Sequence, residues 1–238
     1  MCAHYEALRE WERYVKYFKI EQPQTAVQLP LHVFPTGMAS MIRRPAELDS
    51  GDEAVPAHEV VLGHFGLLPG FAKEIKYGLR TYNARTETLD QLASFKYAWR
   101  KPRHCIIPCE AIYEPDWRTG KHIPTRITRA DGAPIGVAGL WSPWKDPVTG
   151  AWQGSFTMLT INADTHPIFR ELQRPDKKRP PEMQDKRMVV MLNEDSYAAW
   201  LDAPVEKSRE FFVQYPAEKL IAIGEPAKQR ADLFGDAR

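Results

Sequence analysis

The feature that most constrains the fold is a succession of short apolar or alternating runs, separated by clusters of glycine, proline and aspartate. The runs are VQLPLHVF (27–34), HEVVLGHFGLLP (58–69), RHCIIPCEAIYE (103–114), PTRITRA (124–130), PIGVAGLW (134–141), SFTMLTINA (155–163) and RMVVML (187–192). Runs of this length and pattern are typical of β-strands. ADGAP (130–134) and KDPVTG (145–150), which lie between runs, are typical of hairpin turns. The chain is therefore expected to form a mainly antiparallel sheet.

Three segments are predicted to be helical. Residues 5–18 form an amphipathic pattern whose apolar stripe holds Leu8, Trp11, Val15 and Phe18. Thr88 and Gln91 make a capping-box pattern, which predicts a helix over 88–99. A third helix is expected from a cap at Asn193 through Trp200. Together these elements predict an α+β fold, mostly antiparallel β, with a barrel-like curled sheet and flanking helices in one domain over residues 1–238.

Composition fits a globular cytoplasmic protein. The 238 residues are 43% hydrophobic and 26% charged, which allows one large domain with an ample core. No apolar run approaches the ~20 residues that a membrane span needs, so no membrane association is expected. The three cysteines, Cys2, Cys105 and Cys109, are odd in number and lack the spacing of a disulfide framework. A reducing compartment therefore fits better than secretion.

Charge is balanced overall but not locally. The net charge of +1 gives no global electrostatic case for nucleic-acid binding. Residues 73–103, however, hold eight basic side chains against three acidic ones, with aromatic residues between them: Lys73, Lys76, Arg80, Arg85, Lys96, Arg100, Lys101 and Arg103 are the basic members. Basic groups follow phosphates and aromatic faces stack on unpaired bases, although a solvated helix face gives the same pattern. A weaker basic stretch runs from Arg170 to Arg187.

Several polar residues are candidates for chemistry, each with a structural alternative. His104, Cys105 and Cys109 lie on a predicted strand, where four residues span ~13 Å, too far for two thiolates to share one zinc ion. Asn83 and Arg85 belong either to a turn or to a site that binds a reactive group and a phosphate. Glu114 ends an apolar strand and is either an acid or base with a raised pKa or an ordinary solvated acid.

Five motifs in order resemble one family. They are Cys2 at the start, FGLLPGF (65–71), YNARTET (82–88), CIIPCEAIYEP (105–115) and FTMLTINAD (156–164). The sequence is similar, from Cys2 to about Trp200, to the SOS-response-associated peptidase family of abasic-site processing proteins. The resemblance implies a protein that binds single-stranded DNA containing abasic sites and forms a covalent link to them through Cys2 after loss of Met1. Self-processing peptidase and lyase activities are implied as well.

The resemblance also implies roles for individual residues. Cys2 would carry an amine and a thiol on adjacent carbons, so that an aldehyde closes a thiazolidine ring, which requires that both groups be accessible. Asn83 would hold the amine of Cys2, Glu114 would transfer protons, and Arg85 would bind a phosphate beside the lesion. The segment that holds Lys73, Lys76 and Arg80 becomes a candidate DNA path. No cofactor or metal is implied, and the protein is expected to be a monomer that associates with the nucleoid when it binds DNA.

Two departures from the family pattern affect these roles. His4 stands where the family commonly has a DNA-binding arginine, which would make binding weaker or dependent on pH. Gln173 stands where the family has an active-site histidine, and His166 lies seven residues earlier as a possible substitute. Two alternatives therefore stay open: a degenerate paralogue that only binds single-stranded DNA, and a cysteine hydrolase with Cys2 as an N-terminal nucleophile.

Overall fold

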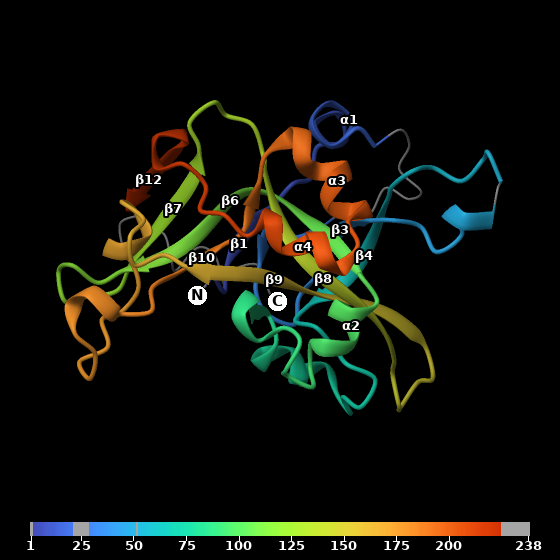
Figure 1. Ribbon diagram of the computed structural model, residues 1–238, viewed down its shortest axis with the longest axis horizontal. Helices are drawn as coiled ribbons and strands as arrows, with labels where there is room; N and C mark the ends of the chain where they lie inside the picture. Colours follow the sequence, from blue (N-terminus) through green and yellow to red (C-terminus); the bar gives the residue numbers. More distant parts are fainter. Residues whose placement is uncertain (1, 21–28, 51, 225–238) are drawn as a thin grey trace.

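A computed structural model describes residues 2–20, 29–50 and 52–224, and within them a closed barrel of five strands forms the centre of the fold (Figure 1). Its strands are β3 (Met38–Arg43), β4 (Glu59–Phe65), β6 (His104–Asp116), β8 (Ile135–Lys145) and β9 (Trp152–Asn162). The hydrogen-bonded order is β6–β3–β4–β9–β8, and β8 closes the ring by pairing with β6. Only the β4–β9 pair in this ring is parallel. The predicted α+β fold with a barrel-like sheet is confirmed.

Strand β6 continues beyond the barrel into a second part of the sheet. Its first half pairs with β3 and β8, and its second half pairs with β1 (Tyr5–Ala7) and β7 (Ile123–Arg129). At the outer edges, β2 (His32–Val33) pairs with β1 and β12 (Leu220–Gly224) pairs with β7. The amino-terminal strand is therefore fixed on the half of β6 that leaves the barrel.

Three short strands extend the edges of β8 and β9. β5 (Asn83–Arg85) runs parallel to β9, β10 (Arg187–Val189) runs antiparallel to it, and β11 (Met191–Leu192) pairs with β8. Because β5 and β10 both pair with the stretch of β9 around Thr160, residues about 100 positions apart in sequence meet there.

The loop before β5 depends on two glycines. Gly66 has φ +127°, and a Cβ atom on it would lie 2.5 Å from backbone atoms of Gly78. Thr81 then fastens the two segments, since its hydroxyl donates to the carbonyl of Leu67 and its own carbonyl accepts from the Leu67 amide. Only glycine allows this approach. The FGLLPGF motif thus positions the chain that enters β5.

Four α-helices lie around the sheet in the described part of the chain: α1 (Trp11–Phe18), α2 (Lys96–Arg100), α3 (Tyr197–Asp202) and α4 (Val205–Ser208). Figure 1 shows α3 and α4 across one face of the barrel and α2 near one end. The Trp200 indole donates to the carbonyl of Cys105 and so holds α3 to β6. Short 3-10 turns cover Leu48–Ser50, Ile75–Arg80, Thr86–Thr88, Phe169–Glu171, Pro181–Met183, Glu194–Ser196, Arg209–Phe211 and Ala217–Lys219. No helix among the described residues is both long and apolar enough to span a bilayer.

Two helix predictions are wrong in extent. The segment 5–18 begins as strand β1, because residues 5–7 pair with β6 and β2, and the helix starts only at Trp11. Leu8 and Phe18 of the predicted apolar stripe are buried and Trp11 packs against the core, but Tyr14 is buried in place of the exposed Val15. The helix predicted over 88–99 is limited to α2, and the segment before it consists of turns and a 3-10 turn.

Some of the remaining predictions of local structure are confirmed, and one is wrong. A helix after Asn193 is present, although it opens with a 3-10 turn and Asn193 makes no side-chain cap. KDPVTG forms the predicted turn between the paired strands β8 and β9. ADGAP is not a hairpin turn, because β7 and β8 do not pair with each other and instead lie end to end along β6. Residues 27–28 of the first predicted strand lie outside the described residues.

Candidate functional site

Cys2 is buried at the junction of β1 and β5. Its side chain is 0% exposed in the chain that carries Met1, and its thiol donates to the carbonyl of His4 at 3.4 Å. Burial, followed by the charge of Glu114, raises the pKa of the Cys2 thiol to about 12. A thiol in this state is a poor nucleophile. The expectation that the thiol is accessible is therefore not met while Met1 is attached.

Asn83, the first residue of β5, holds Cys2 by its backbone. The side-chain nitrogen of Asn83 donates to the carbonyl oxygen of Cys2 at 2.6 Å. The other atom of this amide, Oδ1, is buried and has no hydrogen-bond partner among the described residues. A buried acceptor without a partner carries a free-energy penalty that a ligand or a new terminal amine could remove. Asn83 thus reaches the carbonyl group of Cys2, and the contact with the free amine stays a prediction.

Glu114 lies on the part of β6 that extends beyond the barrel. Its side chain is 1% exposed, and it sits opposite Thr125 of β7. Burial raises the pKa of the Glu114 carboxyl, and a hydrogen bond from Gln173 partly opposes this effect. Because its charge also raises the pKa of the Cys2 thiol, the two groups interact electrostatically. Of the two interpretations of Glu114, the buried acid with a raised pKa describes the structure.

Gln173 is fixed beside Glu114 by the backbone of Arg187. The Gln173 side-chain oxygen accepts from the amide of Arg187 at 3.1 Å, and its nitrogen donates to the Arg187 carbonyl at 2.6 Å. The same nitrogen also donates to Oε2 of Glu114, at 3.1 Å. Lys186 donates to the carbonyls of Leu172 and Gln173 and so fixes the turn, in which Gln173 has φ +64°. The amide cannot rotate without losing two of these bonds.

His166 has a different environment. Its Nε2 lies 2.9 Å from the carbonyl of Tyr215, and its Nδ1 accepts from the amides of Ile168 and Phe169. Both ring nitrogens are thus engaged in holding a loop. The structure brings Gln173, and not His166, to Glu114.

His4 is held in an aromatic stack near Cys2. Its ring lies between Phe34, with 4.4 Å between centroids, and Tyr113, with 4.1 Å. Its Nε2 is 2.9 Å from Nδ1 of His32, and which of the two nitrogens is the donor depends on the tautomers. Sequence reasoning did not find His32 and Phe34, since they lie in a short edge strand and its loop without a recognisable motif. The alternation in LHVF was the available signal.

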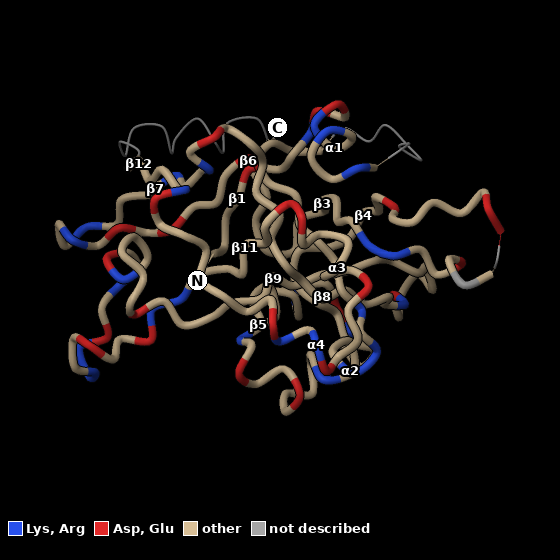
Figure 2. The backbone as a smooth tube through the Cα atoms, turned by 45° about the horizontal axis from the view of Figure 1, so that its top comes forward, with Lys and Arg blue, Asp and Glu red and all other residues tan. Residues whose placement is uncertain are grey.

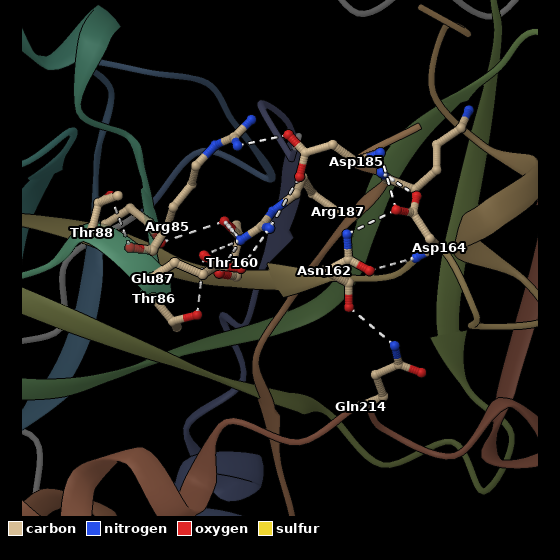
Figure 3. Close-up of polar contacts among 12 residues, drawn as sticks. Arg85, Thr86, Glu87, Thr88, Thr160, Asn162, Asp164, Asp185, Arg187 and Gln214 are labelled. Atoms are coloured by element: carbon tan, nitrogen blue, oxygen red, sulfur yellow. Dashed lines mark hydrogen bonds and ion pairs between the residues drawn. The ribbon is translucent and has the colours of Figure 1, made fainter. Parts of the chain in front are cut away.

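Arg85 ends β5 within a network of ion pairs (Figure 3). Its guanidinium donates to Asp185 at 2.7 Å, and Asp185 also contacts Arg187. Arg187 in turn makes two bonds of 2.8 Å to Glu87 and one to the carbonyl of Thr160. The sequence indicated Arg85 as a phosphate ligand but gave no sign of Asp185, which is 100 residues away and reaches it only through the pairing of β5 and β10 with β9.

The other predicted DNA-binding residues lie at the surface. Lys73, Lys76 and Arg80 are exposed, and the neighbouring Phe71 is more than half exposed. Figure 2 shows further basic segments near α2 and α4. The loop with Lys73 is fixed to the β8–β9 hairpin, because the Trp144 indole donates to the carbonyl of Ala72. Exposed cations on an ordered loop are compatible with phosphate contacts.

The described residues offer no obvious place for a metal ion. They contain no group of three histidine, cysteine or acidic side chains arranged as ligands. Cys105 and Cys109 are buried on strand β6, and burial raises the pKa of both thiols. As predicted, HCIIPC is part of a strand, and its cysteines belong to the core.

Comparison with known proteins points to one family. The family model described as SOS response associated peptidase (SRAP) matches residues 1–224. The abasic site processing protein YoqW of Bacillus subtilis is 26% identical over 212 residues, which cover 85% of this chain and 80% of YoqW. The abasic site processing protein YoaM of the same organism is 29% identical over 186 residues, covering 71% of this chain and 72% of YoaM.

Solved structures show the same fold. A crystal structure of a Bordetella bronchiseptica protein is 43% identical to this chain with a TM-score of 0.80, and the match covers 94% of this chain and 100% of the other. A Bacteroides thetaiotaomicron protein at 18% identity has a TM-score of 0.75 over 97% of this chain and 94% of its own. The second likeness concerns the fold alone.

Proposed function

Because the chain belongs to the SOS response associated peptidase (SRAP) family, we propose that it processes abasic sites in DNA by capturing them covalently through Cys2. The names of the relatives YoqW and YoaM support the processing of abasic sites. The covalent step is supported by the position of Cys2 behind Met1, by its hydrogen bond from Asn83 and by the electrostatic effect of Glu114 on its thiol.

The proposed reaction begins with removal of Met1. Hydrolysis of the Met1–Cys2 peptide bond frees an α-amine, which is partly neutral near physiological pH. This amine adds to the aldehyde of a ring-opened abasic sugar, and the adduct loses water to give an imine. The Cys2 sulfur then adds to the imine carbon while its proton passes to the nitrogen, which closes a five-membered thiazolidine. An N-terminal cysteine alone offers both nucleophiles on adjacent carbons.

Asn83 and Glu114 have complementary roles in this proposal. Asn83 fixes Cys2 by its carbonyl, and its unpartnered Oδ1 is available to accept from the released amine. Glu114, with its raised pKa, donates the proton that turns the carbinolamine hydroxyl into water and takes a proton back at ring closure. The same carboxyl is the candidate base for self-processing and for strand cleavage by β-elimination.

Gln173 limits that chemistry. An amide has no proton to exchange near neutral pH, so Gln173 holds Glu114 in place without relaying protons. Capture depends chiefly on the amine and thiol of Cys2 itself, whereas peptide or strand cleavage needs repeated proton transfer. We therefore expect a crosslink that persists and weak lyase turnover.

Single-stranded DNA is the proposed partner. Arg85, which lies two residues after the Cys2 partner Asn83, and His4, whose carbonyl accepts from the Cys2 thiol, are the proposed contacts to the strand beside the lesion, with Lys73, Lys76 and Arg80 along its path. Unpaired strands expose both phosphates and base faces, which suits the exposed basic residues of the loop that holds Lys73 and the exposed ring of Phe71.

The observation that carries the proposal is the 2.6 Å bond from the Asn83 amide to the Cys2 carbonyl, beside a buried carboxyl that acts electrostatically on the Cys2 thiol. The test mixes the purified chain, freed of Met1, with a single-stranded oligonucleotide that contains one abasic site. We expect an adduct that survives denaturing electrophoresis. Its intact mass should equal the chain without Met1, plus the oligonucleotide, minus one water.

Two controls make this test decisive. Cys2→Ser keeps the amine but lacks the thiol, so it should give little stable adduct, and the same oligonucleotide without the lesion should give none. Absence of an adduct with the demethionylated chain, or an undiminished adduct with Cys2→Ser, would refute covalent capture by Cys2.

Gln173 also favours a second candidate, a protein that shields single-stranded DNA without chemistry. Salt-sensitive binding to the oligonucleotide with no covalent product would support this candidate over the first.

A further inference from the structure

We infer that Asp185 competes with DNA phosphate for Arg85 and thereby sets the affinity of the site for single-stranded DNA. The inference rests on the proposed function, in which Arg85 binds a phosphate. In the structure the Asp185 carboxylate occupies Arg85 with a charge and a geometry that a phosphate oxygen would replace (Figure 3).

The carboxylate of Asp185 contacts three arginines. Its Oδ2 lies 2.7 Å from Nη1 of Arg85 and 3.6 Å from Nη1 of Arg179. Its Oδ1 lies 3.4 Å from Nη1 of Arg187. Figure 3 shows Asp185 between Arg85 and Arg187. One acid thus connects β5 with the loop before β10.

The arginines on either side of Asp185 in Figure 3 differ in how easily they can leave. Arg187 has a side chain only 3% exposed, and it is held by Glu87 and by the carbonyl of Thr160. Arg85 is 46% exposed, and Asp185 is the acid that pairs with it among the described residues. Arg85 is therefore the member that can turn to an external anion while the rest of the network stays in place.

The backbone around Asp185 is built to present its carboxylate. Asp185 has φ +56°, a left-handed conformation that a residue other than glycine adopts at a free-energy cost. Asp164 stabilises this turn, since its carboxylate accepts from the amides of Asp185 at 3.1 Å and Lys186 at 2.7 Å. Asn162 in turn donates to Asp164. Strand β9 thus fixes the direction in which Asp185 points.

When a phosphate replaces Asp185 as the partner of Arg85, no charged side chain of the network is left without an ion pair. When Arg85 turns away, Asp185 keeps Arg179 and Arg187 as partners. The three arginines are balanced at rest by three acids, because Asp176 pairs with Arg179 and Glu87 with Arg187. Arg85 is therefore neutralised before DNA arrives, and a phosphate contact at Arg85 must replace an existing ion pair.

The test compares Asp185→Asn with the unmodified chain. Asparagine tolerates the left-handed conformation as aspartate does, so this substitution removes the charge and keeps the turn. Binding of an undamaged fluorescent single-stranded oligonucleotide is measured by anisotropy at fixed salt. We expect binding about fivefold tighter, the value of one released exposed ion pair.

Two further variants separate the contact from a general effect of charge. In an Arg85→Ala background, Asp185→Asn should give no gain in affinity. Asp176→Asn, which removes an acid from the same network without touching Arg85, should change affinity much less than Asp185→Asn. Asp185→Gly, which adopts the left-handed conformation freely, provides a second variant, and thermal unfolding verifies that each protein is folded.

An unchanged or weaker affinity in both folded Asp185 variants would overturn the inference. So would an equal gain in the Arg85→Ala background or with Asp176→Asn. The experiment uses no lesion and forms no covalent bond. Failure of adduct formation through Cys2 would therefore be seen in a separate assay from failure of the competition at Arg85.

Discussion

Gln173 donates a hydrogen bond to Glu114 through an amide whose orientation is fixed by both backbone groups of Arg187. The side-chain oxygen is occupied by the Arg187 amide, so only the nitrogen can face the carboxylate. Burial alone disfavours the ionised form of Glu114. The hydrogen bond from Gln173 stabilises that form and partly offsets the effect of burial. This relation underlies the first two predictions.

Glu114→Gln should increase stability near neutral pH and reduce adduct formation. The folded-state pKa of Glu114 is raised, so the folded chain binds more protons than the unfolded chain between the two pKa values, and stability falls as pH rises through that window. Glu114→Gln has no carboxyl to ionise, so its stability does not fall across this pH window. At pH values above the window, its thermal midpoint should exceed that of the unmodified chain. Adduct formation should slow about 100-fold, as expected for loss of a general acid–base group. A lower midpoint at neutral pH would contradict the account of burial.

Gln173→Leu should move the pH dependence of adduct formation. Loss of the donor leaves the Glu114 carboxylate less stabilised, so its pKa should rise further. The pH–rate profile of the unmodified chain should contain a limb that depends on Glu114 and is absent in Glu114→Gln. In Gln173→Leu this limb should shift to higher pH. A merely structural role for Gln173 would lower the thermal midpoint and leave the position of that limb unchanged.

Asn83→Ala should slow capture. The variant loses the hydrogen bond to the Cys2 carbonyl, which is worth about 1 kcal/mol, so the rate of adduct formation should fall about fivefold or more. The measurement is the initial rate with the abasic oligonucleotide at saturating concentration. An unchanged rate would show that the position of Cys2 does not depend on this bond.

His166→Ala should destabilise the fold without abolishing capture. The variant loses the ring nitrogens that hold Tyr215, Ile168 and Phe169, at a cost of about 1–3 kcal/mol and about 2–4 °C in thermal midpoint for each kcal/mol. His166→Asn, whose side-chain oxygen can accept from the same amides, should lose less. Folded His166→Ala that forms no adduct would restore His166 as a catalytic residue.

Thiol accessibility should depend on Met1. The chain has three cysteines, all 0% exposed with Met1 attached, so Ellman's reagent should label none in the folded protein and three in denaturant. After treatment with methionine aminopeptidase, we expect one thiol, Cys2, to react within minutes. If no thiol becomes reactive after this treatment, the proposed capture by Cys2 fails.

Much of the fold was accessible from the sequence, because alternating runs between turn clusters report directly on strands. The helices were less accessible. Residues 5–7 have a pattern compatible with a helix, but their pairing with β6 and β2 determines their structure. ADGAP has the composition of a hairpin turn, yet β6 is long enough to pair with the strands on both sides of it.

Some residues of the candidate site could likewise be predicted from the sequence, and others could not. Asn83 and Glu114 were found because motifs carry them; in the structure Asn83 donates to the Cys2 carbonyl and Glu114 acts electrostatically on the Cys2 thiol. The burial of Cys2 was not foreseen from the sequence. Neither were the contacts of Gln173 with Arg187 and of Arg85 with Asp185, because strand pairing brings together residues from distant parts of the chain.

Strand β6 carries Glu114 outside the closed ring, as an overhang that the ring supports but does not enclose. Glu114 therefore pairs with β7 and not with a strand of the closed ring. The fold thus separates the strands that close the barrel from the part of β6 that carries Glu114 of the candidate site.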